Sequence, residues 1–464
     1  MQEFWSAVGS AIAAASDFVC GYPLFIVLFC GGLFLFFYSG CAPVRRYGEA
    51  IRNLRRQDSS GEGQISSIEA FASAIAATMG VGNIAGVTIA ISVGGPGAIF
   101  WMWVSALLGM ATKLFEGTLA TMYKGRDSAG EVQGGLMYIV QSALGKRWKP
   151  VAVIFSCFGL LECLCLMQAN QLTEIATAIF AAPESDVMML HLYIGLGVTA
   201  VVTAVVVGGL QRTANFATRI VPFMIGLYFL MVFYIILTHL GSMPGVFKSI
   251  FVEAFKPDAV LGGGIAAFVF VATTGFRRAM LVNEAGMGTA SMMHGASKQK
   301  EPVREGLSAM ICPSIDSGLV CTLTAIAILV QKDLLPMGGG LGSMEGLKLA
   351  VASFDASIPY VGKYLLLTVI FCFSFSTMFS YSYYGQKCTG YLFGARYAKW
   401  YRVPYLIMLV VAAVIPLRTV VSLVDLAGAI MTFCTMSVLL KLAPQARNRM
   451  KQYFNNERYS IFAK

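Results

Sequence analysis

A run of small and polar residues interrupts one apolar segment of this chain near its middle. The run extends from Thr78 to Gly86 and reads TMGVGNIAG. Inside a membrane, the N–H and C=O groups of an unwound turn must be satisfied by protein, water or a ligand. The new helix ends offer N–H groups to a carboxylate and carbonyl oxygens to a cation, although a simple kink or close helix packing is the alternative. The candidate binding residues are Thr78, Gly80, Gly82 and Asn83.

The composition indicates that this run lies in a membrane protein. Hydrophobic residues make up 57% of the 464 positions, charged residues only 12%, and the mean hydropathy is +0.70. No soluble core needs that much apolar surface, and apolar runs recur almost from end to end. We therefore expect one all-α polytopic bundle. The 11 cysteines include no CxxC pair, so neither a disulfide frame nor a metal site is expected.

Segments of about 20 apolar residues predict eleven transmembrane helices. The first twenty residues contain no lysine or arginine, which argues against a cleaved signal peptide and favours an interfacial helix. The predicted spans are 22–40, 67–93, 96–123, 150–180, 191–209, 219–240, 261–290, 305–330, 364–392, 403–417 and 420–442.

The distribution of basic residues predicts the orientation of these spans. The alternate segments that would lie inside hold 24 of the 34 lysines and arginines, whereas the outside segments hold 6. Basic loops stay on the cytoplasmic side, so we expect the N-terminus outside and the C-terminus in the cytoplasm. The net charge of +10 then follows from topology and attraction to anionic lipid, and no nucleic-acid partner is needed.

The chain divides into two halves of opposite orientation. Residues 1–66 supply the interfacial helix, an extra span and a basic loop, and residues 443–464 form a basic cytoplasmic tail. Between them, residues 67–240 and 241–442 each hold five spans, and each set opens with a glycine-interrupted helix. A pair of interrupted helices in corresponding positions is typical of an inverted-repeat secondary transporter with a binding site at the midplane. The second interruption is predicted at Ala272–Phe276, followed by 283–288.

Several ordered motifs resemble the alanine/glycine:cation symporter family over roughly residues 65–395. They are GVGNIAG (80–86), GGPGAIFWMW (94–103), GMATK (109–113) with Glu116-Gly117, NEAGMG (283–288) and Ile315-Asp316. This resemblance implies a leucine-transporter-like fold with two broken helices. It also implies uptake of a small neutral amino acid coupled to sodium or, less often, to a proton.

The resemblance also implies the residues of the binding site. The first break would hold the substrate carboxylate, and Thr273 and Thr274 would receive its amine, with Phe276 as a wall. A polar pair, Gln168 and Asn170, would face the substrate, with interhelical hydrogen bonding as the alternative. The cation ligands implied by the fold are the carbonyls of Ala76 and Met79 and the hydroxyls of Ser376 and Thr377.

Three further residues carry open alternatives. Glu284 and Asp316 lie within predicted spans, where an ionisable group could contact the substrate, take a proton or act in gating. An ion pair with Arg277 or Arg278 is the alternative for Glu284. Tyr381 stands where family members commonly have tryptophan, which leaves room for a larger or more polar substrate such as serine or glutamine.

Transport is the function that these patterns favour. An intramembrane enzyme would need a nucleophile with its base or a metal cluster, and the three histidines lie far apart in sequence near span ends. A channel or an amino-acid sensor of the same fold remains the alternative. We expect a monomer in the plasma membrane, which for a bacterium is the inner membrane, with no cofactor and no metal other than sodium.

Overall fold

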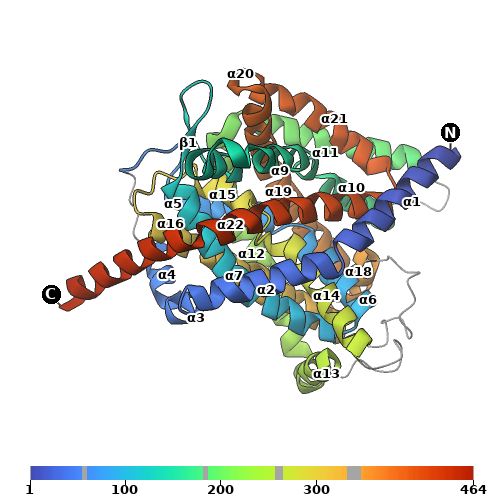
Figure 1. Ribbon diagram of the computed structural model, residues 1–464. Coiled ribbons are helices and arrows are strands. Elements are labelled where there is room, and N and C mark those ends of the chain that lie inside the picture. Colours follow the sequence, from blue (N-terminus) through green and yellow to red (C-terminus); the bar gives the residue numbers. More distant parts are fainter. Residues whose placement is uncertain (1, 55–59, 181–185, 256–264, 332–345, 463–464) are drawn as a thin grey trace.

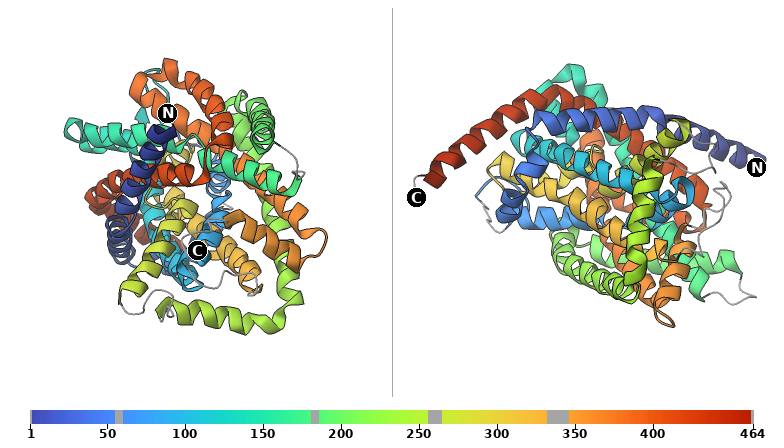
Figure 2. Two further views of the ribbon diagram at one scale, coloured as in Figure 1. Left: turned by 90° about the vertical axis from the view of Figure 1, so that its right-hand side faces the viewer. Right: turned by 90° about the horizontal axis from the view of Figure 1, so that it is seen from below.

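The computed structural model shows a predominantly helical bundle (Figure 1) and describes residues 2–54, 60–180, 186–255, 265–331 and 346–462. A single short hairpin is described, in which β1 (Gly125–Arg126) pairs antiparallel with β2 (Val132–Gln133). α1 and the far end of α22 project from opposite ends of the bundle (Figure 2). The fold is therefore all-α in its membrane part, as the composition predicts.

The first half of the chain forms the following helices. They are α1 (Gln2–Val19), α2 (Tyr22–Tyr38), α3 (Ala42–Arg45), α4 (Tyr47–Leu54), α5 (Ser67–Thr78), α6 (Gly82–Gly94), α7 (Gly97–Met122), α8 (Leu136–Ile139), η1 (Val140–Leu144), η2 (Lys146–Trp148), α9 (Lys149–Glu162), α10 (Leu166–Phe180), α11 (Val187–Val206), α12 (Gly209–Thr238), η3 (Leu240–Ser242) and α13 (Met243–Phe255).

The second half continues in the same manner, with one long helix at its end. Its elements are α14 (Ile265–Asn283), α15 (Thr289–His294), α16 (Pro302–Pro313), η5 (Ser314–Val320), α17 (Cys321–Leu329), α18 (Gly346–Ser357), α19 (Gly362–Phe393), α20 (Ala395–Ala398), η7 (Lys399–Tyr401), α21 (Arg402–Val414) and α22 (Leu417–Phe462).

Nine helical segments within the described residues are long and apolar enough to cross a membrane. They correspond to nine of the predicted spans. The other two, 261–290 and 403–417, correspond to α14, which carries Arg277 and Arg278, and to α21, which has 13 residues. Residues 261–264 lie outside the described residues. The total of eleven spans therefore stays a prediction.

Two predicted elements have different limits in the structure. The predicted span 150–180 is divided into α9 and α10 at Cys163–Cys165, where Cys165 has a φ of 54°. The predicted tail over 443–464 is not separate from the last span, because α22 continues without a break to Phe462. The break at Cys163–Cys165 contains no glycine that would have indicated it. The continuation of α22 arises because the tail contains good helix formers such as Ala446.

Local sequence explains where the helix at the first interruption begins. Ser66 caps α5: its hydroxyl accepts a hydrogen bond from the Glu69 N–H, and the Glu69 carboxylate accepts one from the Ser66 N–H. This capping box satisfies donors that a helix start leaves free. The cap fixes the start of α5, twelve residues before the break.

Small residues bring the central helices close together. α7 packs along α16 and crosses α14. A Cβ added at Gly117 of α7 would lie 2.9 Å from the Cβ of Ala309 in α16, so only glycine allows this approach. Close packing of this kind is the usual means of association between helices in lipid. It places α7 and α16 beside the two interruptions.

Candidate functional site

The first interruption lies where the glycine-rich run predicts it. α5 ends at Thr78 and α6 begins at Gly82, and Met79 is fully buried. The Asn83 side chain closes the turn, since its Oδ1 accepts a hydrogen bond from the Gly80 N–H at 3.1 Å. The Thr78 hydroxyl donates to the carbonyls of its own helix at Ala74 and Ile75. The break is thus a defined turn and not a smooth kink.

Four oxygen atoms converge at this turn from α5 and α19. The Thr377 hydroxyl lies 3.4 Å from the Ala76 carbonyl oxygen, and the Ser376 hydroxyl lies 3.5 Å from that of Met79. Both hydroxyls also donate to the Phe373 carbonyl of their own helix, Ser376 at 2.9 Å and Thr377 at 3.1 Å. The long contacts to α5 are weak hydrogen bonds. Neutral carbonyl and hydroxyl oxygens form a ligand set that suits a hard cation such as sodium.

Gly80 permits α19 to reach the break. A Cβ at this position would lie 2.7 Å from the Thr377 Oγ1 atom, closer than real side chains pack. Gly82 has a different neighbour, because a Cβ there would lie 3.7 Å from Val282 Cγ2 of α14. Gly80 therefore adjoins the oxygen cluster, whereas Gly82 adjoins α14.

The second interruption lies in the second of its two predicted stretches, 283–288, and not in the first. The prediction of a break at Ala272–Phe276 is wrong, because α14 is continuous from Ile265 to Asn283. Gly275 serves close packing instead: a Cβ there would lie 2.5 Å from the Ala98 carbonyl oxygen of α7. The chain unwinds between α14 and α15, where Glu284, Gly286 and Gly288 have φ values of 51°, 87° and 85°.

Thr273, Thr274 and Phe276 consequently do not meet the first break. Thr274 lies beside Gly94, at the far end of α6, about 18 Å along that helix from Gly82. Phe276 is buried in an aromatic cluster, with its ring centroid 5.2 Å from that of Phe25. The structure therefore separates these three residues from the site for which the resemblance proposed them.

Carboxylates fix the second interruption to its surroundings. Glu284 is 2% exposed and accepts hydrogen bonds from the hydroxyls of Thr289 and Tyr381. The Gly286 N–H donates to Glu116 Oε1 of α7 at 2.6 Å. The predicted pocket residue Tyr381 thus contacts Glu284 and joins α19 to this turn. Sequence reasoning did not foresee that contact.

Asp316 lies in η5, a π-helical turn that separates α16 from α17. Such turns are frequent at functional sites. The residue is fully buried, and the Thr78 hydroxyl of the first break lies close to its carboxylate. Its backbone carbonyl lies 3.5 Å from Asn83 Nδ2, and Lys113 and Glu284 are close enough to influence its charge. This carboxylate therefore adjoins both interruptions.

The polar pair on α10 divides into two different environments. The Asn170 side-chain amide donates to the carbonyls of Ala412 and Ile415, at 3.0 and 2.8 Å, and so caps the end of α21. These contacts support the alternative of interhelical hydrogen bonding over contact with a substrate. Gln168 is half-buried. The Cys165 thiol, at the break before α10, lies 4.0 Å from the Thr377 carbonyl.

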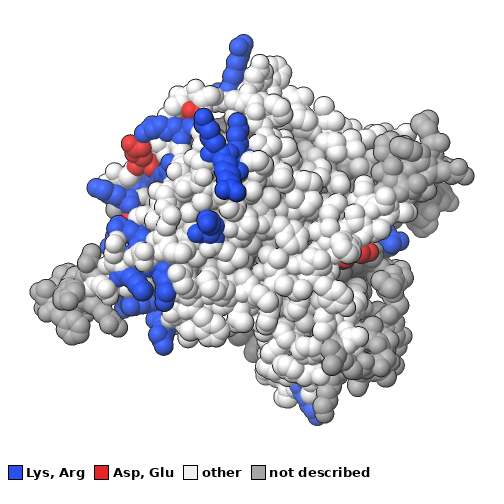
Figure 3. All heavy atoms as spheres, viewed as in Figure 1, with Lys and Arg blue, Asp and Glu red and all other residues white. Residues whose placement is uncertain are grey.

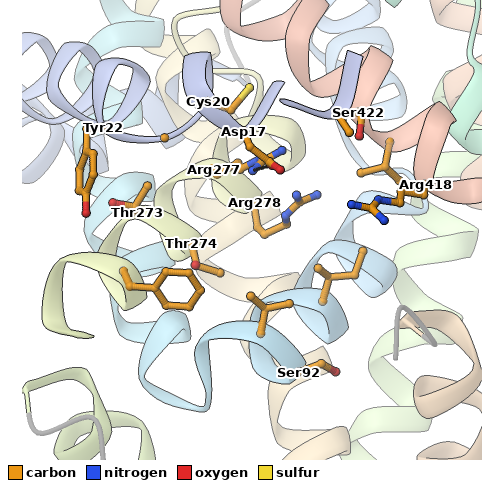
Figure 4. Close-up of a pocket in the computed structure, with 16 residues that line it drawn as sticks. Asp17, Cys20, Tyr22, Ser92, Thr273, Thr274, Arg277, Arg278, Arg418 and Ser422 are labelled. Carbon is orange, nitrogen blue, oxygen red and sulfur yellow. Dashed lines mark hydrogen bonds and ion pairs between the residues drawn. The ribbon is translucent and has the colours of Figure 1, made fainter. Parts of the chain in front are cut away.

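A cavity of about 580 Å³ lies at the other end of α6 (Figure 4). Thr273, Thr274, Arg277, Arg278 and Arg418 line it. Arg277 and Arg278 do not pair with Glu284, so the ion pair that the sequence left open as an alternative is not formed. The contacts are Arg277 Nε to Asp425 Oδ2 at 2.7 Å, Arg277 Nη1 to Asp17 Oδ1 at 3.1 Å and Arg278 Nη2 to Asp425 Oδ2 at 3.0 Å.

The architecture matches that of a solved transporter. The structure of MhsT in complex with L-phenylalanine aligns with 84% of this chain and 99% of its own, with a TM-score of 0.60 and 14% sequence identity. At that identity the likeness establishes the fold. The helical bundle, with a core helix unwound between α5 and α6, therefore has a leucine-transporter-like fold, for which broken core helices are typical.

The sequence comparisons identify the family among proteins of this fold. The model of the sodium:alanine symporter family matches residues 5–461, so the chain belongs to this family. It is 33% identical to the sodium/alanine symporter AgcS of Methanococcus maripaludis over 94% of both chains. It is 30% identical to a protein of Bacillus subtilis named as a probable sodium/glutamine symporter, over 95% of this chain and 90% of that one. The chain is accordingly a membrane transporter and not an enzyme.

Proposed function

We propose that this protein imports a small neutral amino acid by symport with sodium. The observation that carries the proposal is the convergence of two α5 carbonyls with two α19 hydroxyls at the first break. A sodium ion there would bridge the two helices, and its charge would favour the closure of one upon the other. The named functions of the relatives AgcS and the glutamine symporter support the same coupling ion.

The substrate would lie between the first break and the end of α14. Gly82 and Gly86 both face Val282, at 3.7 and 3.5 Å from a Cβ added to them. In this proposal the backbone at Thr78, Gly80 and Gly82 faces the amino-acid carboxylate, with Asn83 holding the turn. Gln168 and Tyr381 border the substrate, whereas Asn170, Thr273, Thr274 and Phe276 are no longer included.

Asp316 supports proton coupling as the second candidate. A fully buried carboxylate inside a membrane is costly unless it binds a proton or a cation. Symport with protons would therefore depend on Asp316, and symport with sodium on Ser376 and Thr377. Glu284 has two hydroxyl donors, and we propose that it positions the second break rather than carrying a proton.

The proposed topology has eleven spans with the N-terminus outside. Lysine and arginine gather at one end of the bundle (Figure 3), the end at which α5 begins. We propose that this end faces the cytoplasm, that 67–240 and 241–442 are the inverted repeats between segments 1–66 and 443–464, and that the protein is a monomer in the plasma membrane.

Substrate choice is proposed to depend on Tyr381, which occupies a buried position on α19. Replacement by tryptophan would remove the hydroxyl bonded to Glu284 and enlarge the side chain. We expect Tyr381→Trp to change the order in which alanine, glycine, serine and glutamine compete for uptake. An unchanged order would contradict a role of Tyr381 in specificity.

Uptake into liposomes tests the proposed function. The purified protein is reconstituted, and labelled alanine, glycine, serine and glutamine are offered under a sodium gradient alone or a proton gradient alone. We expect concentrative uptake with sodium, which Asp316→Asn would preserve if the proton plays no part. A channel would only equilibrate the amino acid, and a sensor would bind it without flux. Absence of concentrative uptake under either gradient would refute symport.

A further inference from the structure

A second cavity, of about 1020 Å³, lies between the β1–β2 hairpin and the end of α19. Four basic side chains line it from α19 and the short elements that follow. The hairpin closes the cavity at one point, where Ser128 Oγ accepts a hydrogen bond from the Ala395 N–H at 2.8 Å. The four residues, called the basic pocket below, are Lys387, Arg396, Lys399 and Arg402.

The charges of this basic pocket are not balanced by its acidic neighbours. Glu62 is engaged by Arg126 at 2.9 Å, and Asp127 accepts hydrogen bonds from the Gln133 side chain and from the backbone of its own turn. Glu131 is exposed on the same hairpin. Among the residues that the structure describes, none of the four basic side chains forms an ion pair. The cavity therefore has an excess of positive charge.

One of the four basic groups is buried, and a second is half-buried with one buried donor atom. Lys387 is 7% exposed, and its ammonium lies 4.7 Å from the centre of the Tyr383 ring. Arg402 has a buried Nε without a partner, while its Nη1 donates to the Val207 carbonyl at 3.3 Å. Burying an unpaired cation is unfavourable unless an anion compensates it. These groups indicate a bound anion.

An apolar groove of about 650 Å³ adjoins the basic pocket. Residues 393–404 border both hollows: Arg396, Lys399 and Arg402 face the first, whereas Phe393 and Trp400 face the second. The latter two are 63% and 68% exposed. The opposite wall is α9, whose Leu160 and Leu161 lie along the groove, together with Leu164 just beyond its end. The same short segment thus separates a cationic surface from an apolar surface.

We propose that these two hollows together bind one anionic glycerophospholipid. The phosphate would lie in the basic pocket, and an acyl chain would follow the groove along α9 from Cys157 to Leu161, about 6 Å of helix, and past Leu164 beyond the helix end. Basic pockets between membrane helices on the cytoplasmic side suit such headgroups. The proposed orientation places α9 with its Lys149 end on that side, so the chain would point toward the bilayer centre.

Lipid binding to the full-length protein tests this proposal. Protein in neutral detergent is titrated with phosphatidylglycerol, phosphatidylcholine or soluble glycerol 3-phosphate, and bound ligand is counted by native mass spectrometry. We expect one phosphatidylglycerol bound at least about tenfold more tightly than phosphatidylcholine. Glycerol 3-phosphate should bind weakly because it lacks the acyl chains.

Paired variants distinguish this site from general attraction to anionic lipid. The exposed pair Arg396→Gln/Lys399→Gln should reduce phosphatidylglycerol affinity about tenfold or more. The control Arg147→Gln/Lys149→Gln removes two exposed charges outside both hollows and should not reduce it. Leu161→Trp fills the groove and should weaken lipid binding without affecting glycerol 3-phosphate.

Several results would overturn the proposal. They are equal affinity for phosphatidylglycerol and phosphatidylcholine, equal loss in both double variants, and glycerol 3-phosphate binding as tight as the lipid. Size-exclusion chromatography establishes that each variant is folded. If the double variant does not fold, Lys399→Gln alone provides the same comparison with Lys149→Gln.

Discussion

The two interruptions of the core helices differ in the groups that hold them open. At the first, carbonyl and hydroxyl oxygens face one another between the break and α19, with Asp316 nearby. At the second, Glu284 adopts a left-handed conformation and accepts two hydroxyl hydrogen bonds, and Glu116 accepts a backbone N–H. A residue other than glycine in that conformation costs about 1–2 kcal/mol, which these hydrogen bonds offset.

This difference indicates that the two breaks have different roles. The weak contacts of the first leave its oxygens available to a cation. The hydrogen bonds of the second have carboxyl groups as acceptors and connect α15, α7 and α19, so they hold these elements in fixed relative positions. We infer that ligands act mainly on the first break and that the second provides its fixed counterpart. The following substitutions test this comparison.

The largest effect is expected from Gly80→Ala. The added Cβ would lie 2.7 Å from Thr377 Oγ1, so α19 or the break must shift. Overpacking of this kind costs up to about 3 kcal/mol, which corresponds to roughly 100-fold in cation-dependent uptake. Sodium-driven uptake by liposomes measures it. Gly226→Ala on α12 is the control, because nothing lies within 4 Å of its added Cβ. Equal rates for both variants would remove Gly80 from the site.

Tyr381→Phe tests the hydrogen bonding of Glu284 at the second break. It removes one of the two hydroxyl donors to the buried Glu284 carboxylate, which should lower the free energy of unfolding by about 1–3 kcal/mol. Chemical denaturation in detergent measures the change, with exposed Tyr193→Phe as the control. We expect the sodium concentration for half-maximal uptake to stay constant. A shift in that concentration would show that the second break takes part in cation binding.

Thr377→Val should affect the cation alone. The substitution preserves the shape of the side chain but removes one oxygen from the cluster, so half-saturation by sodium should need about tenfold more of the ion. Thr377→Ser keeps the hydroxyl and should restore the original sodium dependence. Uptake is measured as a function of sodium concentration for both variants. If the Thr377→Val and Thr377→Ser curves coincide, the cation binds elsewhere.

The smallest effect is expected from Thr273→Val. The Thr273 hydroxyl is buried without a hydrogen-bond partner among the described residues, so valine should be neutral or stabilise the fold by up to about 1 kcal/mol. Uptake should not change, since this residue lies at the far end of α6. Thermal unfolding and uptake are measured together. A large loss of uptake in a folded variant would return Thr273 to the substrate site.

The first break was predictable because its glycines and Asn83 are poor helix formers in an apolar segment. At the second, the stretch 283–288 was predicted correctly, whereas Ala272–Phe276 was wrongly included because Gly275 has the same local signature but serves the approach of α14 to α7. The break at Cys163–Cys165 has no glycine, and only the polar Glu162 before it departs from the apolar pattern. Glycine alone thus does not distinguish an unwound turn from close packing.

Contacts between distant segments were beyond what the sequence could indicate. Arg277 is close to Glu284 along the chain, yet it pairs with Asp425, which is 148 positions away. Asn170 matched a family position for a polar side chain, and its amide instead reaches the end of α21. The choice between candidate partners depends on how helices cross, which local patterns do not specify.

Helix α22 is long enough to connect ion pairs at opposite ends of the bundle. Asp425, near one end, pairs with Arg277 and Arg278 at the cavity beside α6, and Arg449, near the other, pairs with Glu301 at 2.6 Å. The 24 residues between them span about 36 Å of helix, more than the hydrocarbon core. A tilt of α22 at one end would therefore be transmitted to the ion pair at its other end, unless the helix bends at Pro444.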